Sequence, residues 1–559
     1  MFYEKPWILK TPDQKAYEEL LYRGFLPPLI ARILATRGFS SASQAYAFLY
    51  PEISDFSNPF LLQGIEDAVK RIEKAYLNRE KIAIYGDSDA DGVLGSFILY
   101  HFLKNFFSEI EVVIPSKELE GYGFHAKFLP FLKEKGVNLI ITVDVGISSS
   151  ETVEQAKALG MDVIITDHHE ITSLPRTYVV SGKLAEKDSP FYFLCGAGVA
   201  FLFIRAIRSY FYYKGYLKNP VPNLRQYLEI VSLATLADMV PIKGENRVIT
   251  FFGFRDLASP SFPAVKTLVE KYSQFGEITE EDVSFKIIPL INAAGRMGKP
   301  ELAFQFLCAQ TREEAEKLLT ELELINTLRQ EKELSILEEL EKEIPYFEHR
   351  DTFLLLSKEG IPRGLLGLIA NRLKNSYGVP VLVIGFENGI GYASGRAPKG
   401  FDLLGVIKEC QDLIIQFGGH PSALGFTVKK ENLEALIKRL ASLMQKRKSL
   451  SQNKTEMFFI DAETKISEIL EKETLAALMQ LPPFGEEHSP PLFLIKNFEI
   501  EKVKVLKEKH SRLELREAKF KMSAICFNKV FETLPRAILA YPQYNPYRSC
   551  LELKIKDAY

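Results

Sequence analysis

Short apolar runs alternate with amphipathic segments over the first half of the chain. The strand-like runs lie at 82–85, 111–115, 138–143, 162–166 and 177–181. The segments between them, such as 93–106 and 149–159, have the length and period of helices. Nearly continuous apolar strands that alternate with helices predict a parallel sheet covered on both faces. We assign this domain to residues 76–310.

Other patterns divide the rest of the chain. Residues 1–75 predict a small helical arm without chemistry, and 311–345 predict one long helix, since Thr311 to Ile344 contains neither Gly nor Pro. This helix could serve as a spacer between domains or form a short coiled coil, and the sequence leaves both roles open. Residues 346–445 predict a smaller α/β domain, 446–455 a polar linker, and 456–559 an OB-type β-barrel of short alternating strands. The fold class is therefore multidomain α/β.

Composition limits the class of protein and the cellular compartment. The chain has 559 residues, a net charge of −2 and five cysteines without a CxxC pair. These features are typical of a reduced cytoplasmic protein without disulfides or structural zinc. No run approaches a membrane span and the N-terminus has no signal pattern, so we expect no membrane association, and we expect a monomer. A near-neutral charge confines any nucleic-acid surface to a local patch.

Candidate chemistry begins directly after the first strand of the parallel sheet. Asp87, Asp89 and Asp91 stand at alternate positions ahead of Gly92 and an apolar helical segment. Three acids so close together repel one another, and a hard divalent cation would relieve the repulsion through oxygen ligands. A solvated acidic turn that caps the following helix explains the same residues. This stretch alone leaves both interpretations open.

Two further strand ends also carry ligand-type residues. The run 138–143 leads into Asp144, and 162–166 leads into Asp167, His168 and His169. A further apolar segment carries Asp238 just ahead of Val240 and Pro241. Ligands in parallel sheets bind beyond the carboxyl ends of the strands, so these groups should converge. Carboxylates and imidazoles without a thiolate favour Mn²⁺ or Mg²⁺. Six candidate ligands exceed one site, so two ions are expected, which suits attack on a phosphodiester.

The ordered motifs GDSDADG, TVDVG, TDHHE and LADMVP resemble those of the DHH phosphoesterase superfamily. The runs IPSKELEGYGF, LCGAGVAF, GENRV, INAAGRMG and FGGHPSALGFT resemble the RecJ family of exonucleases within it. The resemblance implies a DHH catalytic domain, a DHHA1 substrate-binding domain after the long helix, and a C-terminal OB-fold.

The resemblance also implies roles for the acidic motifs. Asp89 and Asp91, assisted by Asp87, would bind the metal pair, and Asp144 would bridge it. His168 and Asp238 would complete the ligand set. His169 would face the scissile phosphate, and Asp167 would orient the two histidines. Activated water would be the nucleophile, so none is needed from a serine or cysteine.

Substrate contacts are implied outside the metal motifs. The candidates are Lys117, Arg296, Ser394, Arg396, Gly418, Gly419 and His420. Arg296 alone is equally consistent with a surface ion pair. Three departures from the family affect this set: Ile361-Pro362 replaces Trp-His, Ala397 replaces Ser, and Lys117 replaces an arginine. They concern recognition of the 5′ end and leave the metal ligands intact.

Residues 501–521 hold eight Lys or Arg against four Glu. An OB-type barrel with such a face would hold single strands through phosphate contacts and stacking, and a solvated charged face is the alternative. The resemblance implies a 5′→3′ exonuclease of single-stranded DNA that releases mononucleotides in repair and recombination, with a helicase and a single-strand-binding protein as possible partners. The alternatives are a DHH phosphodiesterase of short oligonucleotides or cyclic dinucleotides, and a non-catalytic scaffold.

Overall fold

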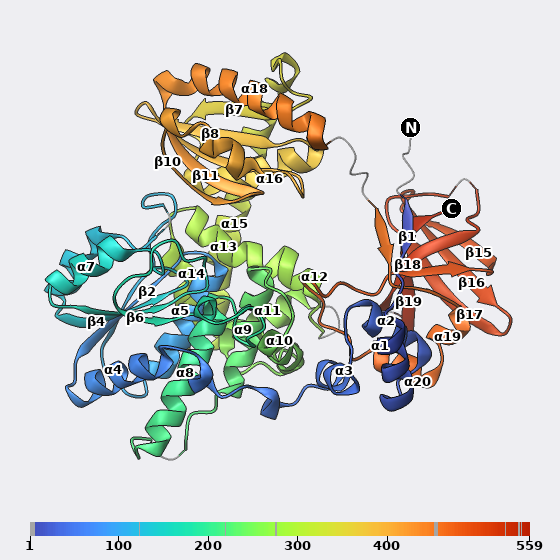
Figure 1. Ribbon diagram of the computed structural model, residues 1–559, viewed down its shortest axis with the longest axis horizontal. Coiled ribbons are helices and arrows are strands. Elements are labelled where there is room, and N and C mark those ends of the chain that lie inside the picture. The colour runs from blue at the N-terminus through green and yellow to red at the C-terminus, as the bar shows by residue number, and fades with distance from the viewer. Residues whose placement is uncertain are drawn as a thin grey trace.

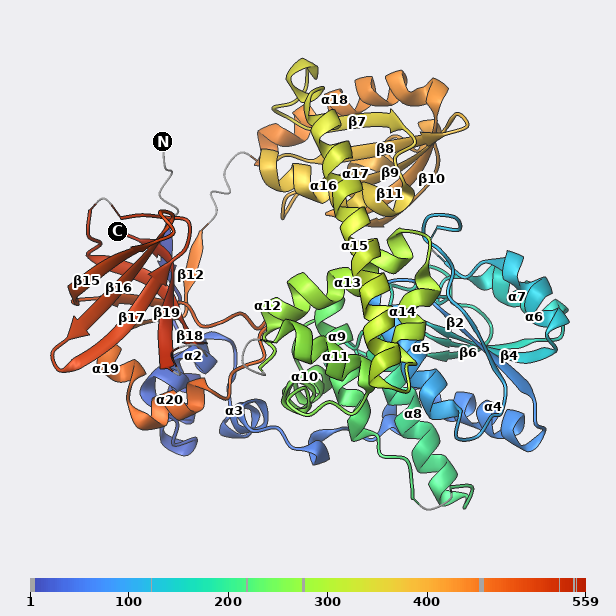
Figure 2. The same ribbon diagram turned by 180° about the vertical axis from the view of Figure 1, so that it is seen from behind.

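The computed structural model describes the chain except residues 1–5, 122, 218–219, 274–276, 452–456, 532, 546–547 and 549. Figures 1 and 2 show a parallel-sheet domain, a smaller α/β domain beside it along a long helix, and a C-terminal module against which the first helices of the chain pack. No helix within the described ranges combines the length and apolar character needed to cross a bilayer.

The parallel sheet contains the five predicted strands. They are β2 (Lys81–Gly86), β3 (Ile110–Val113), β4 (Val137–Val143), β5 (Asp162–Thr166) and β6 (Tyr178–Val180). All pairs are parallel, in the order β3-β2-β4-β5-β6. The chain goes from β2 to one side of it and then returns to the other, so the order reverses between β2 and β4. Ligand crevices in such sheets form at the carboxyl ends of strands at this point.

Alternate residues of β2 enter two separate cores. Ile82 and Ile84 face α4 (Ile65–Leu77), α5 (Ala90–Leu103), α8 (Gly196–Tyr213) and α9 (Leu228–Ala237). Ala83 and Tyr85 face α6 (Leu129–Glu134) and α7 (Ser150–Ala158). A sheet buried on both faces explains why the strands read as continuous apolar runs.

A series of helices follows the parallel sheet in the chain and leads to the smaller α/β domain. They are α10 (Glu245–Asp256), α11 (Pro263–Tyr272), α12 (Glu280–Asp282), α13 (Ile288–Arg296), α14 (Pro300–Leu307) and α15 (Arg312–Glu341). α15 is the predicted long helix, and Thr311 caps it by accepting the Glu314 N–H at 3.2 Å. Leu319 packs in the core of the parallel-sheet domain and Leu340 in that of the smaller α/β domain. The helix therefore spans both domains.

The smaller α/β domain has a mixed sheet in the order β10-β11-β9-β8-β7. The strands are β7 (Leu354–Glu359), β8 (Val381–Glu387), β9 (Ile390–Arg396), β10 (Ile414–His420) and β11 (Ala423–Lys429). Its helices are α16 (Arg363–Tyr377), α17 (Leu403–Lys408) and α18 (Leu433–Ser451). α18 corrects the predicted linker, because residues 446–451 continue a helix whose Leu436, Leu440 and Met444 are buried. Residues 452–455 of that linker lie outside the described residues.

The C-terminal module, residues 457–559, contains one seven-stranded sheet in the order β13-β14-β18-β19-β17-β16-β15. Its strands are β13 (Ala462–Thr464), β14 (Phe493–Lys496), β15 (Glu499–Leu506), β16 (His510–Glu517), β17 (Phe520–Cys526), β18 (Ala537–Asn545) and β19 (Cys550–Ala558). Two short helices, α19 (Ile466–Ile469) and α20 (Lys472–Leu478), accompany it. Strand β18 was not among the strands expected from the sequence.

The first 75 residues do not form one arm, which corrects the prediction. β1 (Trp7–Leu9) pairs in parallel with β12 (Phe458–Ile460). α1 (Gln14–Glu18), α2 (Pro28–Thr36) and α3 (Ala42–Leu49) share a core with the C-terminal module, whereas α4 packs on the parallel sheet. The apolar face of each helix determines where it packs, and the partners of these faces lie in distant parts of the chain.

Candidate metal centre and active site

Main-chain hydrogen bonds extend the parallel sheet by one residue at three strand ends. The Asp87 N–H donates to Val143 O at 3.1 Å, and the Asp144 N–H donates to Thr166 O at 2.8 Å. The Asp167 N–H donates to Val180 O at 3.3 Å. Three acidic residues from distant motifs are thereby fixed along the same edge of the sheet.

The Asp87–Asp91 loop combines helix capping with convergence on this edge. Asp89 is the N-cap of α5, and its Oδ1 accepts the Gly92 N–H at 3.2 Å. Asp91 accepts the N–H groups of Gly196 at 2.6 Å and Ala197 at 2.8 Å, at the start of α8. A Cβ on Gly196 would lie 2.5 Å from the Asp144 Cβ, so only glycine allows this approach. The capping interpretation is thus correct for Asp89, and the carboxylates still gather.

His168 lies at the centre of the gathered carboxylates. Its Nε2 is 3.1 Å from Asp144 Oδ1, 3.5 Å from Asp238 Oδ2 and 3.8 Å from Asp91 Oδ2. Asp144 is 2% exposed and adopts a left-handed backbone with φ 61°. Asp144 Oδ1 and His168 Nε2 are both buried without a hydrogen-bond partner among the described residues. Buried polar atoms are normally satisfied, so this pair fits ligands directed at a cation.

The structure contains three sets of candidate ligands, and within each set the ligand atoms lie within 4.8 Å of one another. The sets are Asp87, Asp89 and Asp144; Asp91, His168 and Asp238; and Asp144, His168 and His169. Asp144 and His168 are each shared by two sets. We call the six residues Asp87, Asp89, Asp91, Asp144, His168 and Asp238 the acidic cluster. Carboxylate oxygens with one or two imidazoles are a donor set that suits Mn²⁺ or Mg²⁺. The cluster therefore has enough donors for two cations, and Asp144 would be shared by their ligand sets.

Burial and mutual repulsion raise the pKa of two carboxyl groups of the cluster, and burial lowers the pKa of its histidine. Burial and the neighbouring Asp89 raise the pKa of Asp91 to about 7. Burial and the charges of Asp91 and Asp89 raise the pKa of Asp238 to about 8. Burial, with the nearby His169, lowers the pKa of His168 to about 4, so its ring is neutral and can act as a ligand.

Asp167 orients the second histidine. Its Oδ1 accepts the His169 Nδ1–H at 2.8 Å and the His168 N–H at 2.7 Å, and its Oδ2 accepts the Ile147 N–H at 2.9 Å. Burial opposes the charge on His169, but the contact with Asp167 raises the pKa of His169 to about 9. The His169 side chain is 51% exposed. A half-exposed imidazolium beside the acidic cluster can meet an anionic substrate.

Lys117 lies inside this site. Its Nζ is 3.2 Å from Asp87 Oδ2 and 3.0 Å from Asp89 Oδ2, and the residue is buried. Two residues near the site were not found from the sequence. Lys183 pairs with Glu170 at 2.8 Å and disfavours protonation of His168, while Asn292 Oδ1 accepts the Ala90 N–H at 2.8 Å. Neither belongs to a ligand-type motif.

The predicted substrate contacts of the smaller α/β domain fall into two groups. Arg396 Nη1 donates to Ser394 Oγ at 3.0 Å, beside Gly367 of α16. Gly418, Gly419 and His420 form the end of the edge strand β10. Lys183 chiefly, and His420 after it, hold the pKa of Glu170 below its usual value, so His420 lies near Glu170.

Arg296 joins the two α/β domains. Its Nη1 donates to Gly364 O at 3.0 Å, and the Gly364 N–H donates to Glu118 Oε2 at 3.1 Å. A Cβ on Gly364 would lie 2.5 Å from Arg296 O, so α13 and α16 meet closely. Pro362 stands at the N-cap of α16, so the Ile361-Pro362 departure lies at this same junction.

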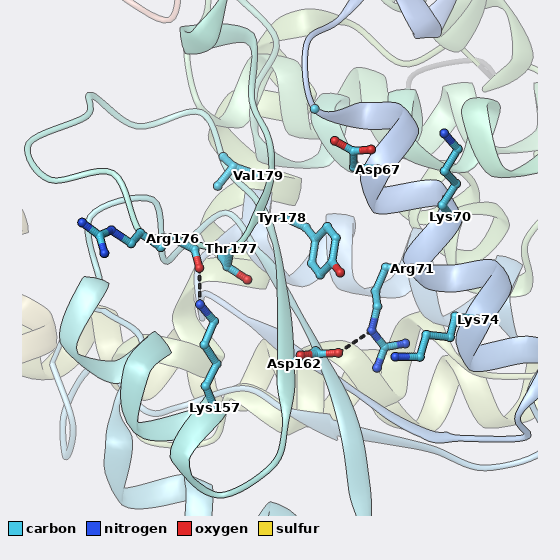
Figure 3. Close-up of a pocket in the computed structure, with 11 residues that line it drawn as sticks. Asp67, Lys70, Arg71, Lys74, Lys157, Asp162, Arg176, Thr177, Tyr178 and Val179 are labelled. Carbon is cyan, nitrogen blue, oxygen red and sulfur yellow. Dashed lines mark hydrogen bonds and ion pairs between the residues drawn. The ribbon is translucent and has the colours of Figure 1, made fainter.

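A cavity of about 620 Å³ lies at the opposite edge of the parallel sheet. Figure 3 shows Asp162, the first residue of β5, near Tyr178, the first residue of β6, and Arg71 of α4 donates to Asp162 at 2.6 Å. The acidic cluster occupies the carboxyl ends of the strands. This cavity is therefore separate from the candidate active site.

Comparisons with known families agree with the fold and the motifs. The model for the DHH family, N-terminal domain, matches residues 81–235; the DHHA1 domain matches 350–446; and the RecJ OB domain matches 460–557. The single-stranded-DNA-specific exonuclease RecJ of Escherichia coli (strain K12) is 30% identical over 442 residues, which cover 75% of each chain. The chain belongs to the RecJ family.

Other RecJ proteins extend the match. RecJ of Bacillus subtilis (strain 168) is 33% identical over 94% of this chain, which spans 66% of that protein. A crystal structure of Thermus thermophilus RecJ with Mn²⁺ superposes with a TM-score of 0.81 at 24% identity, over 99% of this chain and 79% of that one. A structure of exonuclease RecJ bound to manganese has a TM-score of 0.59 at 28% identity, over 69% of this chain and 95% of that one. The predicted multidomain α/β fold is thus confirmed.

Proposed function

We propose that this chain is a metal-dependent exonuclease that hydrolyses single-stranded DNA from the 5′ end to mononucleotides. The observation that carries the proposal is the acidic cluster, in which Asp144 Oδ1 and His168 Nε2 are buried and have no hydrogen-bond partner within the described structure. Membership of the RecJ family supports the substrate class. The match of this fold to RecJ structures that hold Mn²⁺ supports the choice of cation.

The acidic cluster would hold two Mn²⁺ or Mg²⁺ ions. When bound, such ions activate a water and neutralise charge on the scissile phosphate. Asp144 lies between the two ligand sets and would fix their spacing. Asp167 keeps the His169 Nδ1–H occupied at 2.8 Å, so Nε2 of this charged ring is left to donate to a phosphate oxygen. Lys117 would balance the carboxylates and approach the same phosphate.

The smaller α/β domain would hold the strand on the other side of the cleft. Ser394, Arg396 and the glycines at 418–419 offer donors to phosphates, and His420 lies near Glu170 of the parallel-sheet domain. Arg296 would act from the junction between the domains. We assign 76–310 to the DHH domain, with α4 added to it, 346–451 to the DHHA1 domain and 457–559 to the OB domain.

The C-terminal module would bind the rest of the strand. Lys502, Lys504, Lys507 and Lys509 make no ion pair among the described residues, and β15 is an exposed edge strand. Phosphate binding by such lysines predicts affinity that falls steeply with salt. We further propose a monomer in the cytoplasm, a reducing compartment in which the five free cysteines would stay reduced. A helicase and a single-strand-binding protein would supply the strand.

The test compares strands labelled at either end, the matching duplex and a dinucleotide, each with Mn²⁺. Early release of the 5′ label as a mononucleotide from the single strand, faster than hydrolysis of the duplex or the dinucleotide, supports the proposal. Preference for the dinucleotide would instead indicate an oligonucleotide phosphodiesterase, and absence of any hydrolysis would indicate a scaffold. The Asp144→Asn variant controls for contaminating nucleases.

A further inference from the structure

Arg247, in the Gly-Glu-Asn-Arg-Val run at the start of α10, takes no part in the acidic cluster, yet it is only 2% exposed. Its Nε donates to Phe48 O at 2.8 Å. Its Nη1 donates to Leu481 O at 3.0 Å and Pro482 O at 3.1 Å, and its Nη2 donates to Gln480 O at 2.5 Å. One guanidinium thus joins the parallel-sheet domain, α3 and the C-terminal module.

The charge of Arg247 is held by main-chain carbonyls and aromatic rings. It forms no ion pair with a carboxylate within the described residues, and the rings of Phe48 and Phe251 lie 4.4 Å and 5.1 Å away. Burial, with the nearby Arg255, lowers the pKa of Arg247 to about 9. A buried charge is costly unless its donors are satisfied. Here they are satisfied only when all three segments are docked.

The segment that Arg247 binds also contacts the region just after Asp238. The Ile242 N–H donates to Glu486 O at 3.1 Å. A Cβ on Gly485 would lie 2.7 Å from Ile242 Cδ1 and 3.0 Å from Leu236 Cδ2, so this turn packs closely on the end of α9. Glu280 Oε1 accepts the Phe484 N–H at 2.7 Å. The docked surface therefore extends well beyond a single arginine.

We propose that Arg247 locks the C-terminal module in one orientation on the parallel-sheet domain, so that a strand held on the module's lysines is delivered to the acidic cluster. This proposal rests on the proposed function and adds a positioning residue to it. Two binding surfaces in fixed geometry raise the effective concentration of a shared ligand. The lock therefore acts on strands long enough to reach both surfaces, and a dinucleotide does not need it.

The experiment uses full-length Arg247→Met, which keeps most of the aliphatic stem and removes the five donors. The matched control is Arg225→Met, since Arg225 bonds Asp256 on the exposed side of the same domain. Spin labels are introduced as non-canonical residues at Glu154 and Lys472, which are both exposed, because the native cysteines are free. Their distance distribution reports the orientation of the module without any need for hydrolysis.

We expect Arg247→Met to broaden the distance distribution and to raise KM for strands longer than the roughly 4–16 nucleotides that one OB fold covers. The rise in KM should be about tenfold, because the variant loses part of the effective concentration that a ligand gains by binding two surfaces at once. The kcat and KM for a dinucleotide should match those of wild type and Arg225→Met. Gly485→Val, which pushes against Ile242, should give the same split and replaces Arg247→Met if that variant does not fold.

An unchanged distance distribution with an unchanged KM would overturn the proposal. So would an equal loss of kcat on long and short substrates, because that result would place the effect at Asp238. If wild type hydrolyses neither substrate, the proposed function fails, and the distance distribution alone then decides whether Arg247 locks the module.

Discussion

At the residue scale, Asp144 connects the two halves of the acidic cluster. Its carboxylate belongs to the set with Asp87 and Asp89 and lies 3.1 Å from His168. Its left-handed backbone turns the side chain into the cluster while its N–H extends the sheet. No other residue of the cluster combines these contacts among the described residues.

Asp144→Asn should therefore weaken Mn²⁺ binding more than about 100-fold, because loss of an outer partner alone typically costs 10–100-fold. Calorimetric titration with Mn²⁺ measures this directly, and hydrolysis should fall with it. Asp67→Asn on α4 is the matched control and should bind like wild type. Equal affinity in both variants would contradict the assignment of Asp144.

The pKa values of the cluster predict a pH-dependent metal affinity. Asp91 and Asp238, with pKa values of about 7 and 8, hold protons at pH 6 that a cation must displace. Affinity should rise about tenfold per pH unit for each displaced proton between pH 6 and pH 8. Calorimetry at pH 6.5 in two buffers of different ionisation enthalpy should show proton release, and release should be smaller at pH 9. Affinity that does not vary with pH would contradict this prediction.

The same pKa values affect the metal-free fold. The native pKa values of Asp91 and Asp238 lie above the ordinary aspartate value of 3.8, so these carboxyl groups favour the folded state fully below about pH 4. That contribution is lost as pH rises through 7 to 8. Added Mn²⁺ should therefore raise the melting temperature more at pH 8 than at pH 6.

The sequence identified the residues of the cluster, because strand ends in a parallel sheet share an edge and the acidic motifs follow three of them directly. It did not identify Lys183 or Asn292, since a lysine in a loop and an asparagine in a helix carry no distinctive spacing. It placed Arg296 among substrate contacts without its bond to Gly364 O, because the meeting of α13 and α16 depends on tertiary packing.

At the element scale, the contact between α13 and α16 sets how the two α/β domains meet. Periodicity predicted both α15 and α16, yet the crossing of α16 with α13 depends on Gly364, where a side chain would collide with Arg296 O at 2.5 Å. Elements with strong periodicity were predictable. β1 is three residues long and pairs with a strand more than 400 positions away, so its sequence carries no comparable signal.

Gly364→Ala should separate α13 from α16 and lower the free energy of unfolding by about 1–3 kcal/mol, the usual effect of overpacking. It should also raise KM for single strands, because the contacts of Arg296 and Glu118 to this residue are lost. Gly425→Ala on β11 is the control, since its Cβ would meet only Ala393 O at 3.5 Å. Chemical denaturation and steady-state kinetics measure both effects, and equal behaviour of the two variants would contradict the prediction.

At the scale of the whole molecule, the two ends of the chain form one folded unit. Leu29, Ile30 and Ile33 of α2 share a core with Ile466, Phe493 and Ile538, and the Trp7 Nε1–H donates to Asp557 Oδ2 at 2.9 Å. Neither end has its own complete core. The boundaries of this unit could not be predicted by reading the chain in order.

Removal of residues 457–559 alone should therefore yield an aggregating protein, because each uncovered Leu or Ile of α2 loses about 1.5–3 kcal/mol of burial. Removal of residues 1–50 together with 457–559 should yield a soluble monomer of residues 51–456, which should bind single strands more weakly and with less dependence on salt. Light scattering and binding at several salt concentrations distinguish the two truncations. Equal solubility of both would contradict a shared core.

The long separation in sequence between α2 and the C-terminal module also has a consequence for synthesis. About 420 residues separate the end of α2 from the start of β12, and ribosomes add roughly 5–20 residues per second. The apolar face of α2 thus waits roughly 20 to 80 s for its partners, while the parallel-sheet domain between them can already fold. During that interval the nascent chain carries an uncovered apolar surface on α2, and its yield in a cell will depend on what shields that surface until the C-terminal module has been made.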